Sequence, residues 1–193
     1  MGYPRSQLID PTVSGTYHCV SRCVRRAFLC GDDALSGRNF DHRKQWVEDR
    51  LLFLAEVFSA SVLAYAVMSN HLHVVVHMAP EVTANWSDDE VAERWVRLCP
   101  VMVGGEIEPE LCRRKVAALA GNQERVAELR HRLGSLSWLM RCLNERGKAG
   151  VVGWALAHRL NTQTIWCAWM AGRGPPYDIP PSVGWTLVHC GRN

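Results

Sequence analysis

The chain has 193 residues, of which 48% are hydrophobic and 21% charged, a composition typical of a globular protein with one domain and a sizeable core. Its net charge of +3 is too small to indicate a polyanionic partner by itself. The sequence contains no run close to the roughly 20 apolar residues of a membrane span, and its first residues lack the apolar core of a secretion signal. We therefore expect a cytoplasmic protein that does not contact a membrane.

The first half of the chain combines strand and helix patterns. Residues 16–23 are rich in β-forming residues after Gly15 and predict a strand, whereas residues 31–41 are rich in turn formers and predict a loop. From His42 to Phe58 apolar residues recur every three or four positions, which predicts an amphipathic helix.

A hairpin follows this helix. Residues 61–68 and 71–78 are two β-branched, apolar runs separated by Ser69 and Asn70, and an Asn in such a position tolerates the backbone of a tight turn. The order strand, helix, strand, strand predicts an α+β fold, in which an antiparallel sheet carries helices packed on one face.

The following segment is predicted to be helical. Each expected helix has an identifiable start or stop signal, and the last one places apolar residues on a single face. The signals are the capping box of Ser87 and Glu90 before residues 88–98, Pro109 and Gly121 at the two ends of the next helix, Asn122 and Gly134 around the third, and Leu136, Leu139, Met140 and Leu143 within residues 135–146.

The character of the sequence changes after Arg146. Residues 147–193 contain seven glycines, four of the eight tryptophans and a single acidic residue, and they show no sustained periodicity. We therefore divide the chain into a domain of residues 1–146 and an irregular tail of residues 147–193, which has the character of an altered or frame-shifted end.

The eight cysteines are expected to be reduced thiols, since a chain of this size without an export signal does not need disulfides. Cys19, Cys23 and Cys30 are separated by three and six residues, which matches no common zinc pattern. Packing of these small side chains in the first strand and the following turn is the favoured interpretation, with zinc binding as the alternative.

Basic side chains gather in two parts of the chain. Arg22, Arg25 and Arg26 lie near the start, and residues 113–148 hold nine basic side chains against three acidic ones. Such groups are able to follow a phosphate backbone, although charged helix faces are more often only solvated. The candidates in the second group are Arg113, Arg114, Lys115, Arg130, Arg132, Arg141 and Arg146.

The hairpin begins its second strand with two histidines, His71 and His73. Residues two apart in a strand share one face, so these imidazoles are expected to be neighbours while Leu72 points into the core. Two neutral imidazoles supply two ligands to one divalent metal and leave positions open for water or phosphate oxygens. His77 shares the face but lies too far along the strand to join easily. For such a short motif, the alternative interpretation is a pair of surface histidines that bind no metal.

Three motifs together resemble a known family. The string YAVMSNHLHVVV resembles the HUH signature of small single-tyrosine transposases, and YHCVSRCVRRAFL resembles the opening strand of that family with its basic continuation. GSLSWLMRCLNER resembles the helix that precedes its catalytic region. The similarity covers about residues 8–146 and is greatest to the transposases associated with repetitive extragenic palindromes.

The resemblance implies a ferredoxin-like fold and the cleavage and rejoining of single-stranded or hairpin DNA. In the family a tyrosine attacks the scissile phosphate and remains linked to the 5′ end, while Mg²⁺ or Mn²⁺ held by the two histidines polarises that phosphate. His71 and His73 would then be the metal ligands, and Arg22, Arg25 and Arg26 would contact DNA. Mg²⁺ prefers oxygen ligands, so a site with two histidines favours Mn²⁺. If the chain assembles with itself, we expect a homodimer.

The nucleophile that this family requires has no clear counterpart. The family's tyrosine lies on a helix downstream of Arg146, and the four tyrosines here are Tyr3, Tyr17, Tyr65 and Tyr177. Three interpretations stay open: Tyr177 acts from a loop, Tyr17 or Tyr65 approaches the metal from a strand, or the altered tail has removed the nucleophile. The third is favoured, because strand tyrosines usually pack against a helix.

Two further functions remain as alternatives. A non-catalytic protein that binds structured repeat DNA would use the same basic groups without cleavage. A metal-binding regulator would use Cys19 and Cys23 instead of the histidines.

Overall fold

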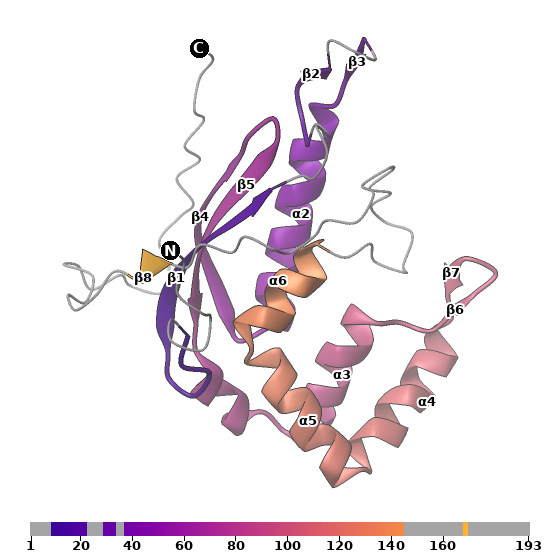
Figure 1. Ribbon diagram of the computed structural model, residues 1–193. Coiled ribbons are helices and arrows are strands. Elements are labelled where there is room, and N and C mark those ends of the chain that lie inside the picture. The colour runs from indigo at the N-terminus through magenta and orange to yellow at the C-terminus, as the bar shows by residue number, and fades with distance from the viewer. Residues whose placement is uncertain (1–8, 23–28, 34–36, 145–167, 170–193) are drawn as a thin grey trace.

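The computed structural model describes residues 9–22, 29–33, 37–144 and 168–169 (Figure 1). A four-stranded antiparallel sheet has the order β4-β5-β1-β8, formed by β4 (Ala60–Val67), β5 (His71–Met78), β1 (Gly15–Arg22) and β8 (Ala168–Trp169). Helix α2 (His42–Val57) leads from β1 to β4, and the hairpin then inserts β5 between these two strands. This split β-α-β order is ferredoxin-like and confirms the predicted α+β class.

The sheet has two chemically different faces because side chains alternate along each strand. On β5, Leu72, Val74, Val76 and Met78 are buried, whereas the residues between them are partly exposed. The pairing of Val20 with His73 aligns the alternation of β1 with that of β5. We call one surface the histidine face and the opposite surface the helix face. The histidine face consists of Thr16, His18, Val20 and Arg22 of β1 and His71, His73, Val75 and His77 of β5.

Helices α2 and α6 (Leu136–Asn144) cover the helix face (Figure 1). Val47, Leu51 and Leu54 of α2 are at most 1% exposed. Helix α6 buries Leu136, Leu139, Met140 and Leu143, as the spacing predicted. Full burial of one such side chain contributes about 1.5–3 kcal/mol, so packing on this side fixes the position of the sheet.

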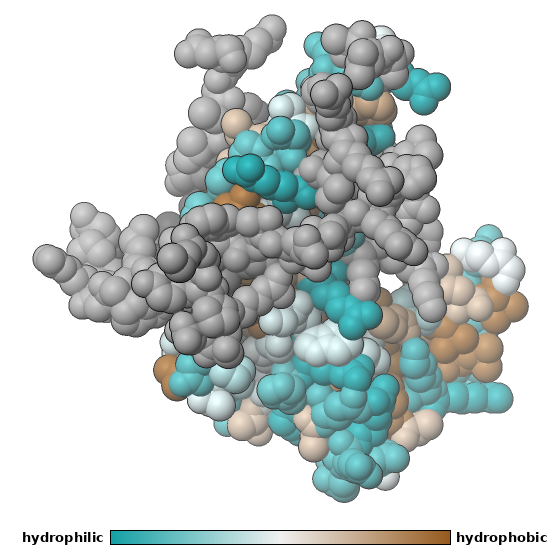
Figure 2. Space-filling model, in the orientation of Figure 1, coloured by the Kyte–Doolittle hydropathy of each residue, from teal (hydrophilic) through white to brown (hydrophobic). Residues whose placement is uncertain are grey.

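A second group of helices extends from the sheet: η1 (Pro80–Asn85), α3 (Asp88–Leu98), α4 (Pro109–Ala120) and α5 (Gln123–Leu133). The predicted caps are present, because Ser87 Oγ accepts from the Glu90 amide at 3.1 Å and Asn122 Oδ1 accepts from the Arg125 amide at 2.9 Å. Helix α4 buries none of its side chains. Hydrophobic surface is visible over this helix and the adjoining turn (Figure 2). None of the helices among the described residues is long and apolar enough to span a membrane.

Two loops in the described part of the chain contain short strands. Within residues 31–41, β2 (Asp32–Asp33) pairs with β3 (Arg38–Asn39). The Gly104-Gly105 loop connects β6 (Met102–Val103) to β7 (Glu106–Ile107), and its glycines have φ angles of 62° and 94°. Positive φ at both central positions is typical of a hairpin turn. The sequence pattern missed these hairpins because strands of two residues are too short to show an alternation.

Candidate metal centre

The hairpin turn between β4 and β5 brings His71 and His73 together. The Met68 amide donates to the His71 carbonyl at 2.8 Å, which closes the predicted two-residue turn of Ser69 and Asn70. Strand β5 begins at His71, so both imidazoles project from the histidine face. Their ring centroids lie 4.8 Å apart, and the rings are inclined by 70°. The start of β5 therefore carries two adjacent imidazole side chains.

His71 is oriented by its neighbour Asn70. Its Nδ1 lies 2.6 Å from Asn70 Oδ1, and an amide oxygen only accepts hydrogen bonds. In the neutral imidazole the proton therefore lies on Nδ1, and Nε2 keeps its lone pair. Metal-binding histidines are typically held in this way, with one ring nitrogen donating to an oxygen and the other facing the metal.

His73 has a different partner, His18 of β1, which sequence analysis did not single out. His18 Nε2 lies 2.9 Å from His73 Nδ1, and the two rings are nearly parallel with centroids 5.1 Å apart. In the strand register His18 pairs with Val75, so it reaches His73 diagonally. The alternation of residues 16–22 was a usable signal for its face, but the register that brings β1 against β5 is not readable from the sequence.

The environment of His73 favours its neutral form. Burial lowers the pKa of this imidazole, and the nearby His71, His18 and Arg22 side chains lower it further. A neutral imidazole is the form that binds a metal, because the protonated ring has no free lone pair. The lowered pKa therefore favours an available lone pair on His73 at neutral pH.

Arg22 places a positive charge beside the histidines. It is exposed at the end of β1 and pairs with His71 in the strand register. Arg25 and Arg26, the other predicted DNA contacts at the start of the chain, lie outside the described residues. Arg22 is thus the member of this basic group that the structure locates at the site.

Several candidate arginines on the helices bind their own chain instead. Arg130 donates to the Trp86 carbonyl at 2.6 Å and to Asp88 Oδ1 at 2.8 Å. Arg113 pairs with Glu110, and Arg132 pairs with Glu128. Their guanidinium groups already have partners on the protein, which makes them weaker candidates for DNA contact than Arg22.

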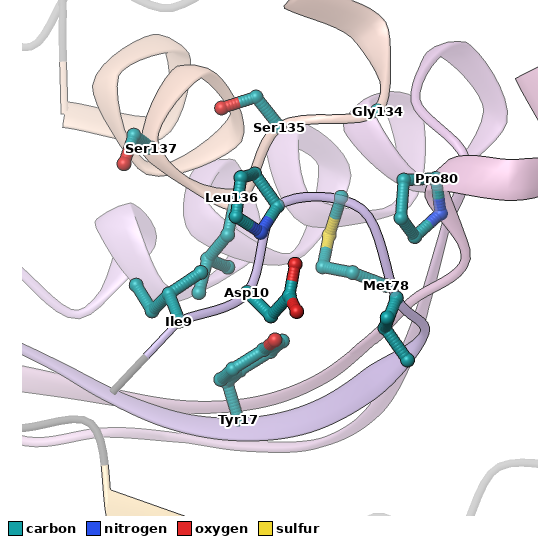
Figure 3. A pocket seen from close by; sticks show the side chains of 11 residues that line it. Ile9, Asp10, Tyr17, Met78, Pro80, Gly134, Ser135, Leu136 and Ser137 are labelled. Carbon is teal, nitrogen blue, oxygen red and sulfur yellow. The ribbon is translucent and has the colours of Figure 1, made fainter. Parts of the chain in front are cut away.

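The described tyrosines point away from the histidine face. Tyr17, which is 4% exposed, points into a pocket on the helix face, between Ile9, Asp10 and Leu136 (Figure 3). Tyr65 pairs with Val74, a residue of the helix face, and burial together with Glu48 raises the pKa of its phenol to about 12. Packing against helices is thus confirmed for both. Tyr3 and Tyr177 lie outside the described residues.

The cysteines in the described part of the chain do not add a metal ligand to this site. The side chains of Cys19 and Cys30 are buried, and Cys30 Sγ donates to the Met68 carbonyl at 3.3 Å. Burial raises the pKa of the Cys30 thiol, which disfavours the thiolate that a metal binds. Cys23 lies outside the described residues.

The histidine pair fits an open metal site. Within the part of the chain that the structure describes, no three His, Cys, Asp or Glu side chains are grouped to hold a metal ion. His77, at the other end of β5, contacts Thr16 Oγ1 through Nδ1 at 3.0 Å. Two imidazoles would leave further coordination positions of such a metal open, and water and phosphate oxygens are suitable ligands for them.

Comparison of the chain with family models, curated proteins and solved structures found no match in any of the three.

Proposed function

We propose that this chain is a transposase of the single-tyrosine HUH class by descent, which binds single-stranded DNA across its histidine face. His71 and His73 would hold Mg²⁺ or Mn²⁺ through ring nitrogens, and the two nitrogen ligands would favour Mn²⁺. The observation that carries the proposal is the adjacent pair of imidazoles on one sheet face, each engaged through Nδ1.

The residues around the pair have separate tasks. When bound, the metal neutralises charge on the phosphate and polarises it for attack. Asn70 leaves Nε2 of His71 available, and burial lowers the pKa of His73 and so favours its neutral form. Arg22 supplies a further positive charge for a neighbouring phosphate, since it extends from the same end of the sheet.

Strand cleavage by this chain is expected to be weak or absent. A nucleophile must be held in line with the scissile phosphate on the histidine face, and Tyr17 and Tyr65 lie on the opposite face. We therefore expect DNA binding without an efficient covalent adduct. An intact single-stranded substrate that forms such an adduct with the purified chain would contradict this expectation.

Fluorescence anisotropy with a labelled DNA hairpin that carries a single-stranded flank tests the proposal. We expect salt-sensitive binding that Mn²⁺ strengthens, and we expect the Mn²⁺ effect to disappear in the double variant His71→Ala, His73→Ala. His77→Ala is the matched control, because this histidine shares the face and the strand but contacts Thr16. Loss of the Mn²⁺ effect in the control as well, or no binding by the unmodified chain, would contradict the proposal.

A non-catalytic protein that recognises structured repeat DNA is the second candidate. The outward position of Arg22, combined with tyrosines that face the helices, favours it. In that case the double histidine variant would bind the hairpin as tightly as the unmodified chain, with and without Mn²⁺. A gel shift that survives both substitutions, without any cleaved strand, would support this candidate.

A further inference from the structure

We infer that His18 is a positioning residue of the metal centre: its Nε2 accepts a hydrogen bond from Nδ1–H of His73 and thereby presents the Nε2 lone pair of His73 to the metal. This inference rests on the proposed function, because it assumes that His71 and His73 are the ligands. His18 does not belong to the ligand set that the sequence motif indicates.

The contact between the two rings is a hydrogen bond, so one of the two facing nitrogens must carry the proton. His18 Nε2 and His73 Nδ1 are 2.9 Å apart, which is the length of a hydrogen bond between nitrogens. If His18 donates, the proton of neutral His73 lies on Nε2, and that nitrogen cannot bind a metal. If His73 donates, its Nε2 keeps the lone pair.

The neighbouring histidine indicates which direction serves the site. His71 Nδ1 faces an acceptor, Asn70 Oδ1, so its Nε2 is left for a ligand bond. With His73 as the donor to His18, both imidazoles have the same tautomer and offer the same nitrogen. Asn70 and His18 are then equivalent partners, one from the turn and the other from the adjacent strand.

His18 is held firmly enough for this task. Strand β1 lies between β5 and β8, and the backbone of His18 pairs with Val75 on one side and Ala168 on the other. Its ring lies nearly parallel to that of His73, at an interplanar angle of 17°. A partner on an internal strand fixes a ring more precisely than one on a loop.

His18 acts through His73 and is not itself a third ligand. In the described residues no three metal-binding side chains are grouped around one point, and the Nε2 atom of His18 is directed at His73. The prediction is therefore specific: an acceptor at this position is needed, but an imidazole is not.

Two substitutions at His18 show whether the site needs a hydrogen-bond acceptor or an imidazole ring. In His18→Gln, the amide oxygen reaches about the position of Nε2 and accepts the same hydrogen bond, whereas His18→Leu keeps the bulk without an acceptor. We expect Mn²⁺ affinity, measured from the free-Mn²⁺ electron paramagnetic resonance signal, to fall about 10- to 100-fold in His18→Leu and to recover in His18→Gln. Thermal unfolding of each variant verifies that it folds.

A second measurement needs neither metal nor a variant. Two-dimensional ¹H–¹⁵N spectra of the histidine rings in the metal-free protein report which nitrogen of His73 carries the proton, and we expect Nδ1. A proton on Nε2 of His73 would overturn the inference, even if His18→Leu failed to fold.

Different results would contradict the positioning role of His18 and the metal centre itself. Mn²⁺ binding that is lost in His71→Ala, His73→Ala but unchanged in His18→Leu would overturn only the role of His18. Absence of Mn²⁺ binding by the unmodified chain would contradict the proposed function, and the positioning role would fall with it. Equal losses in His18→Gln and His18→Leu would also overturn the inference, because the acceptor would then not be the required feature.

Discussion

The two faces of strand β5 differ in what their side chains contact. Leu72 and Val74 on the helix face are 3% and 0% exposed and contact other apolar side chains. His71 and His73, the residues that flank Leu72 along the chain, have polar partners on Asn70 and His18. Alternate residues of one strand thus pack the core and form the candidate metal centre. We therefore expect a substitution on one face to leave the role of the other face unchanged.

The largest expected effect is on the helix face. Leu72→Ala removes a buried side chain and leaves a cavity, so we expect the free energy of unfolding in urea to fall by about 2–5 kcal/mol. The Mn²⁺ affinity of the folded protein should be unchanged. His73→Ala is the converse variant, with a change in stability of less than about 1 kcal/mol and a loss of Mn²⁺ binding. Comparable destabilisation by both substitutions would break the distinction between the faces.

A smaller effect distinguishes arginines of the helices from Arg22. Arg130→Ala removes hydrogen bonds to the Trp86 carbonyl and to Asp88, and we expect a loss of about 1.5–3 kcal/mol of stability without a change in DNA affinity. Arg22→Ala should leave urea unfolding nearly unchanged, weaken DNA binding, and reduce the slope of log affinity against log salt by about 1. If Arg130→Ala weakened DNA binding and Arg22→Ala did not, the site would lie on the helices.

Much of the fold was predictable because its signals are local. The apolar periodicity of α2, the hairpin turn and the caps at Ser87 and Asn122 depend on residues a few positions apart, and each was confirmed. The grouping of His71 and His73 on one face also follows from strand alternation alone. The tail of residues 147–193 lies outside the described residues, apart from the backbone of β8.

The parts that sequence analysis missed depend on contacts between distant segments. The pairing of β1 with β5 brings His18 to His73 across 55 positions, and no local pattern encodes that register. Likewise, the sequence indicates the arginines of α5 as candidates for DNA contact. In the structure, however, Arg130 donates to the Trp86 carbonyl and to Asp88. Charge in a sequence indicates a potential contact, and the fold decides whether that charge is already paired.

The smallest expected effect concerns Tyr65 and depends on pH. Burial and Glu48 raise the pKa of the Tyr65 phenol from 10.0 to about 12. In that interval the unfolded chain releases this proton while the folded chain retains it. The stabilising contribution is therefore complete below about pH 10 and is lost as the pH rises through about 12.

Tyr65→Phe removes this titration, so the urea midpoint of the variant should decline less steeply than that of the unmodified chain between about pH 10 and pH 11. Glu48→Gln is the matched variant, since it keeps a hydrogen-bond acceptor but removes the charge that opposes the phenolate, and its slope should be intermediate. Equal slopes in all three proteins would mean that the phenol is not held against α2. Tyr65 would then again be a candidate to approach the metal, and the assignment of the described tyrosines to the helix face would need revision.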